Sequence, residues 1–161
     1  MKYFTTSALL LMILLTGCHS KPEDFSLTYV MESMGNYRVS IEIGKDKSFQ
    51  IHQQNIFFDN IANEDRIHTS QGYLSDEEYL LLSELIGGSR LFRMKDSYGF
   101  GQEVNRSNLY GTHGDFIYHL IYTEGKKTKY ISIRDNPNDR YSDKFLQLLR
   151  FLSNCISTHS P

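Results

Sequence analysis

The chain has 161 residues, of which 17 are basic and 19 acidic, so its formal net charge is −2. A chain of this length suits one domain with a single hydrophobic core. The slightly acidic balance excludes nucleic acid as the expected partner, because proteins that bind nucleic acid normally present a basic face.

The N-terminal segment has the pattern of a secretory signal. Lys2 and the amino terminus supply a positive start, residues 8–15 form an uncharged apolar run, and the small Gly17 directly precedes Cys18. The apolar run is too short for a transmembrane helix, which needs about 20 apolar residues. Residues 1–18, which end in Leu-Thr-Gly-Cys, resemble the signal of a bacterial lipoprotein with its lipobox.

This resemblance implies where the mature protein begins and where it is held. Residues 1–17 are a signal peptide that is removed, and Cys18 then carries acyl chains, palmitate among them, on its sulfur and amine. Several chains anchor a protein firmly, since each buried methylene contributes about 0.8 kcal/mol. In the lipoprotein sorting pattern, His19 in place of aspartate implies the outer membrane, facing either the periplasm or the outside. The alternatives are an ordinary secretory signal with a structural cysteine and a buried N-terminal helix.

Residues 18–25 are predicted to be a lipidated tether, and residues 26–157 a single α+β domain. Within this domain, apolar side chains alternate with polar ones over residues 37–43, which predicts a strand with one buried face. A turn at residues 44–47 leads to a returning strand near residues 49–51. Further strands are expected at residues 27–31 and 66–74.

A helix is predicted after the last of these strands. Ser75, with Glu78 three residues later, forms a capping box, which is a signature of a helix start. Apolar residues then recur at helical spacing until Gly87 and Gly88, where we expect the helix to end.

The second half of the chain repeats this order. Strands are predicted over residues 115–123 and 128–134, joined by a turn, and Ser142 is expected to cap a closing helix. The apolar residues of that helix fall on one face: Phe145, Leu148, Leu149, Leu152 and Cys155. Because a hairpin followed by a helix occurs twice, we predict an antiparallel sheet built from two β-β-α units, with both helices packed on one face.

This layout resembles small lipoprotein domains of unknown function in bacterial envelopes. The similarity rests on the Tyr37-x-Val39-x-Ile41 strand and on the Tyr98-Gly99 segment after the first helix. It covers most of the mature chain and carries no catalytic residues with it. The chain also lacks a nucleophile elbow, a phosphate-binding loop and a His-Glu-x-x-His motif, so we predict no cofactor, no metal and no catalytic site.

Three titratable side chains, His113, Asp115 and His119, lie close together in sequence. On a strand, Asp115 and His119 would lie about 13 Å apart, too far to share a metal ion, so a packed, hydrogen-bonded His119 is favoured over a metal ligand. Cys155 is left without a partner if Cys18 is lipidated. We interpret it as a small buried hydrophobe rather than as a redox or nucleophilic group.

The segment of residues 95–114 has the composition best suited to function. It runs for about twenty residues without clear periodicity, and such long loops in compact domains are usually functional or disordered. Aromatic side chains on a loop can anchor a partner, because they bring large contact area at little cost in rotamer entropy. The predicted partner-binding residues are Tyr98, Phe100, Tyr110 and His113. The alternative is that these side chains tuck into the edge of the sheet.

Three functions agree with these observations. The favoured one is a lipid-anchored, non-catalytic module that binds another envelope or periplasmic protein, for instance an immunity-type inhibitor of a periplasmic toxin. Its other contact would be the membrane, through the acyl chains on Cys18. The second is a structural or assembly lipoprotein of the envelope, and the third is an envelope hydrolase that uses His113 and Asp115.

Overall fold

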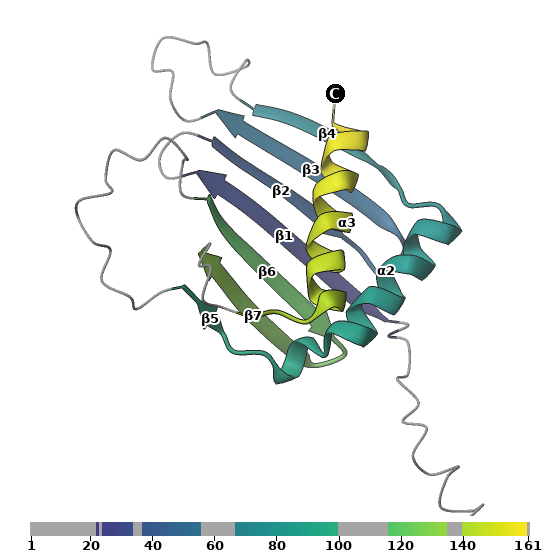
Figure 1. Ribbon diagram of the computed structural model, residues 1–161. Helices are drawn as coiled ribbons and strands as arrows, with labels where there is room; N and C mark the ends of the chain where they lie inside the picture. Colours follow the sequence, from purple (N-terminus) through teal and green to yellow (C-terminus); the bar gives the residue numbers. More distant parts are fainter. Residues whose placement is uncertain are drawn as a thin grey trace, which may run out of the picture.

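A computed structural model describes residues 22, 24–33, 37–55, 67–99, 116–134 and 140–160 (Figure 1). The described strands and helices have the following bounds: β1 Phe25–Ser33, β2 Tyr37–Ile43, β3 Ser48–Asn55, β4 Ile67–Tyr73, α2 Asp76–Ser89, the 3-10 helix η2 Leu91–Arg93, β5 Ser97–Tyr98, β6 Phe116–Glu124, β7 Lys127–Arg134 and α3 Asp143–His159. Helices α2 and α3 lie on the same face of the sheet and pack against each other (Figure 1).

The described strands form one sheet in the order β4-β3-β2-β1-β6-β7-β5. Each neighbouring pair is antiparallel except β5 and β7, which are parallel. The predicted α+β class, with two helices on one face of a mostly antiparallel sheet, is confirmed. The prediction of two β-β-α units is wrong, because the described residues form four strands before α2, and β5 adds a short parallel strand. In the first half of the chain, β1 pairs with β2 and β4 pairs with β3, so the β2–β3 hairpin is flanked by a further strand on each side.

Alternate side chains of the strands face the helices and form the core. Tyr29 at the middle of β1 pairs with Ile41 of β2 and with Leu120 of β6, and each of the three is at most 1% exposed. Full burial of one leucine or isoleucine contributes about 1.5–3 kcal/mol. The alternation predicted for residues 37–43 is therefore confirmed. The buried strand residues on this covered face are Phe25, Leu27, Tyr29, Val39, Ile41, Ile43, Phe49, Ile51, Leu120, Tyr122, Ile131 and Ile133.

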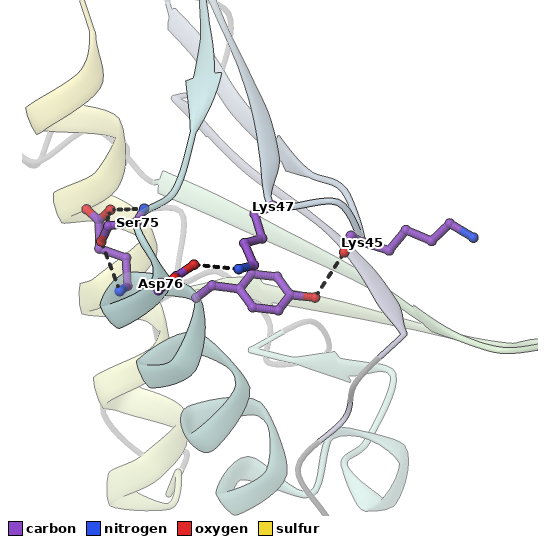
Figure 2. A network of polar contacts seen from close by, with 6 residues as sticks. Lys45, Lys47, Ser75 and Asp76 are labelled. Carbon is purple, nitrogen blue, oxygen red and sulfur yellow. Dashed lines mark hydrogen bonds and ion pairs between the residues drawn. The ribbon is translucent and has the colours of Figure 1, made fainter.

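The start of α2 has the predicted capping box. The Ser75 hydroxyl accepts a hydrogen bond from the Glu78 amide (3.2 Å), and the Glu78 carboxylate accepts one from the Ser75 amide (2.8 Å). Figure 2 shows this cap beside the β2–β3 turn, from which Lys47 donates to the Asp76 carboxylate (2.5 Å). That hydrogen bond lowers the pKa of the Asp76 carboxyl from its ordinary value. The turn and the helix start are thus tied together by polar contacts.

The end of α2 differs from the prediction. The helix continues through Gly87 and Gly88 to Ser89, and it ends where Arg90 adopts a left-handed conformation with φ 53°. A Cβ atom on Gly88 would lie 3.0 Å from Cγ of Lys144 on α3. The glycine therefore serves the close approach of the two helices, and the pattern was wrongly interpreted as a helix stop.

Helix α3 follows its predicted pattern. Its N-cap Ser142 accepts a hydrogen bond from the Phe145 amide (3.3 Å), and the apolar stripe faces the sheet. Cys155 on this stripe is a free, buried cysteine, and burial raises the pKa of its thiol to about 12. The thiol is therefore protonated at neutral pH and packs as a small hydrophobe.

The two ends of the sheet differ. Strand β1 begins at one end, here called the proximal end, where the β2–β3 turn, the β6–β7 turn and α2 also lie (Figure 1). Strands β1, β3, β5 and β7 finish at the opposite, distal end. Residues 34–36, 56–66, 100–115 and 135–139 lie outside the described residues, and each of these segments follows a strand that finishes at the distal end.

Candidate functional site

The candidate site is the face of the sheet opposite the helices. Within the described ranges, no helix covers this face, which is here called the open face (Figure 1). The strand register places one row of side chains straight across it, from β4 to β5: Thr69, His52, Ser40, Val30, His119, Ser132 and Ser97. Most of this row is polar, as expected for a sheet face that meets water.

A groove of about 620 Å³ lies at the proximal end of the open face. It crosses four neighbouring strands, β1 to β4, and each contributes side chains that point to the open side. The open-side lining residues are Ser26, Thr28, Glu42, Gly44, Ser48, Gln50, Gln71 and Tyr73. The size falls within the usual range of ligand pockets, about 300–1,000 Å³. Its chemistry is that of hydroxyls, amides and one carboxylate.

The middle of the open face contains a linked group of polar side chains. Nδ1 of His119 shares a hydrogen bond with the Ser132 hydroxyl (2.9 Å), and Nε2 lies 3.7 Å from the Glu32 carboxylate. Glu32 also lies opposite Arg38 of β2 in the strand register. A hydrogen-bonded His119 was predicted from sequence, and these contacts confirm it.

The charge of the open face is uneven along the strands. In the distal half, the register places Arg38 and Arg134 around Glu32. In the proximal half, Glu42 has no ion-pair partner among the described residues and lies within the groove. The groove is therefore the acidic part of an otherwise neutral to basic face.

The residues predicted from sequence for the site lie elsewhere or outside the described ranges. Tyr98 is half-buried on the helix side of the sheet edge; its ring centroid is 5.1 Å from that of Tyr141, and its hydroxyl accepts a hydrogen bond from the Lys95 amide (3.1 Å). Its role in partner binding stays a prediction. Three predicted partner-binding residues, the candidate hydrolase carboxylate and the predicted lipidation site lie outside the described residues: Phe100, Tyr110, His113, Asp115 and Cys18.

Sequence reasoning missed the groove residues. Glu42 and Gln50 are polar positions in two strands whose polar and apolar residues alternate. Each of them alone resembles an ordinary solvent-facing residue. What brings them together with Gln71 is the register of three strands, which places Gln71 opposite Gln50 and Gln50 opposite Glu42. The alternation was the only signal in the sequence. It predicts on which face of the sheet a side chain lies, but it does not predict which strands pair with each other.

The described part of the chain contains no group of three or more His, Cys, Asp or Glu side chains arranged to hold a metal ion. No helix in those same residues is long and apolar enough to cross a membrane. Comparison with models of known protein families and with curated proteins gives no match.

Proposed function

We propose that the protein is a lipid-anchored bacterial envelope protein that acts as a non-catalytic protein-binding module, with the open face as its binding surface. A concrete form of this function is an immunity-type inhibitor that binds a toxin in the periplasm. The observation that carries the proposal is the one-sided sheet, whose open face is covered by no helix of the described residues (Figure 1) and displays a row of mostly polar side chains from β4 to β5.

The size of the open face supports this role. Six of the described strands have seven to nine residues, and β5 at the edge has two. Six strands spaced about 4.8 Å apart span about 24 Å and extend for about 25 Å. The resulting surface of about 600 Å² approaches the roughly 800 Å² that each partner contributes to a standard protein interface. The surface is also rigid, because every side chain on it stands on a hydrogen-bonded strand.

The anchor in this proposal is Cys18, through the resemblance of residues 1–18 to a lipoprotein signal. Strand β1 begins at Phe25, seven residues after Cys18, and a chain of this length spans at most about 25 Å. Pro22 is buried, so the chain is already close to the domain four residues after Cys18. The lipid would hold the domain by its proximal end, where β1 begins.

The test is affinity capture from native envelopes with the full chain as bait. Tyr130 is 61% exposed on the open side of β7, and Tyr73 is 74% exposed on the open side of β4. We expect the wild type to capture one protein in stoichiometric amount, and the Tyr73→Ala/Tyr130→Ala variant to lose it. The matched control is Leu80→Ala/Leu81→Ala on exposed positions of α2, which should capture the same protein normally.

Two results would contradict the proposal. Capture that is equal for the open-face variant and the wild type would remove the open face as the interface. Failure of the wild type to capture any protein would favour a structural or assembly lipoprotein. Thermal melts of all three proteins should agree within about 0.5 kcal/mol, as expected for exposed positions, so that lost capture reports lost contacts.

A further inference from the structure

We infer that the groove on the open face receives an arginine side chain of the bound protein. This inference rests on the proposed function and names the chemistry of one contact in its interface. The groove is a hollow in the open face, so a protruding side chain of the partner fits there better than a flat surface would.

The charges around the groove favour a cation. Glu42 supplies a carboxylate inside it, and the lining residues include no basic side chain. Asp46 adds a second carboxylate at the proximal rim, where its oxygen would lie 2.7 Å from a Cβ atom on Gly44. The two lysines of the β2–β3 turn pair with carboxylates outside the groove. Lys45 lies 3.8 Å from Asp24, and Lys47 binds Asp76. The lining offers an anionic ligand hydroxyl and amide donors but no positive charge, whereas it offers a cation a carboxylate.

The hydrogen-bonding groups favour arginine over lysine. Gln71, Gln50 and Glu42 are consecutive in one row across three strands, so their acceptor oxygens span about 10 Å. Over the residues that the structure describes, none of these three side chains has a hydrogen-bond partner. Arginine presents five N–H donors in a planar fork, which suits several acceptors in a row, whereas lysine is a compact point charge.

An exposed aromatic ring completes the site. Tyr73 lines the groove at the edge strand β4 and keeps 74% of its surface exposed. A guanidinium group stacks well on such a ring, and the contact gains strength once a partner excludes water from it. The Glu42 carboxylate can pair with the charge of an arginine, the glutamine amides can accept hydrogen bonds from its N–H groups, and the Tyr73 ring can stack on its planar guanidinium group.

The experiment is an NMR titration of the isotope-labelled full chain in detergent micelles. The probe is the tripeptide Gly-Arg-Gly with blocked ends, and the comparison peptides replace arginine by lysine or by citrulline, its neutral isostere. We expect the arginine peptide to shift the backbone amides of Gly44 and Gly72 and the side-chain amides of Gln50 and Gln71. The lysine peptide should bind more weakly, and the citrulline peptide should give no saturable shifts.

Variants separate the groove from general charge effects. Glu42→Gln should weaken binding of the arginine peptide about fivefold, the effect expected for loss of one exposed ion pair. Glu77→Gln, at an exposed carboxylate on α2, should leave it unchanged. Equal binding of the arginine and citrulline peptides, or no effect of Glu42→Gln, would overturn the inference. Saturable groove shifts with chitotetraose instead of the arginine peptide would also overturn it, because the groove would then be a glycan site.

The same variants distinguish this inference from the proposed function. If Glu42→Gln captures the envelope partner as well as the wild type while the Tyr73→Ala/Tyr130→Ala variant does not, the open face is the interface and the arginine contact is wrong. If the wild type captures no protein, the proposed function itself fails, together with the inference that depends on it.

Discussion

The two faces of the sheet are built from alternate residues of the same strands, yet they have different tasks. On β2, Val39 and Ile41 are 0% exposed beneath the helices, whereas their neighbours Arg38, Ser40 and Glu42 belong to the open face. The covered face buries its side chains in one continuous cluster. On the open face, hydrogen bonds join His119 to Ser132 and His52 to Thr69, whereas the side chains of Gln50 and Gln71 have no hydrogen-bond partner among the described residues. The residues of the covered face therefore stabilise the fold, whereas residues of the open face can be substituted with little loss of stability.

The largest expected effect is on the covered face. Ile41→Ala removes a fully buried side chain at the centre of the sheet, and such truncations cost about 2–5 kcal/mol. Ser40→Ala, one residue away on the open face, should change the free energy of unfolding by less than about 0.5 kcal/mol. Urea denaturation of both variants measures the contrast. Similar losses of stability in the two variants would show that the open face is also part of the packed core.

A second, smaller effect is a loss of stability at alkaline pH that comes from the covered face alone. Burial raises the pKa of the Tyr29 hydroxyl from 10.0 to about 12, and burial likewise raises that of the Cys155 thiol from 9.0 to about 12. Because the folded state holds these protons more tightly than the unfolded state, their contribution is complete below pH 9 and is lost as the pH rises towards 12.

Urea denaturation at pH 8 and pH 11 measures this effect. We expect the free energy of unfolding to fall by about 2 kcal/mol or more, because a tenfold difference in proton affinity between the folded and unfolded states corresponds to about 1.4 kcal/mol. Cys155→Ala should remain less sensitive to pH than the wild type between pH 9 and 11, although it is less stable at pH 8. Equal pH sensitivity in the two proteins would mean that the thiol does not take part.

The contrast between the faces also explains how far the sequence predicts this protein. Alternation located the strands, and the Ser75 and Ser142 caps located both helix starts, because these signals act between residues close in sequence. The position of β1 between β2 and β6 depends on a pairing across about ninety residues, which no local pattern encodes. The predicted end of α2 at Gly87 and Gly88 was wrong for the same reason. Gly88 allows the close approach of Lys144 on α3, and this contact between two helices is not encoded in the local sequence.

The candidate site was harder to predict than the fold. Recognition surfaces on a sheet arise when polar residues from several strands come into register, and each residue alone looks like a solvated position. The residues predicted in the loop stand out in the sequence, because aromatic side chains there alternate with glycines. Gln50 and Gln71 do not stand out, and only their pairing on adjacent strands makes them neighbours.

The smallest expected change in stability gives the sharpest test of the open face, because it compares two glutamines on one strand. Gln50 and Gln54 are both exposed on the open side of β3, but Gln50 lines the groove and Gln54 lies towards the distal end. Either change to alanine should leave the free energy of unfolding within about 0.5 kcal/mol of the wild type. Capture of the proposed envelope partner should weaken for Gln50→Ala and persist for Gln54→Ala, as measured by the amount of partner retained per bait. Equal weakening would spread the binding energy over the whole open face, and the reverse order would move the interface to the distal end of the sheet.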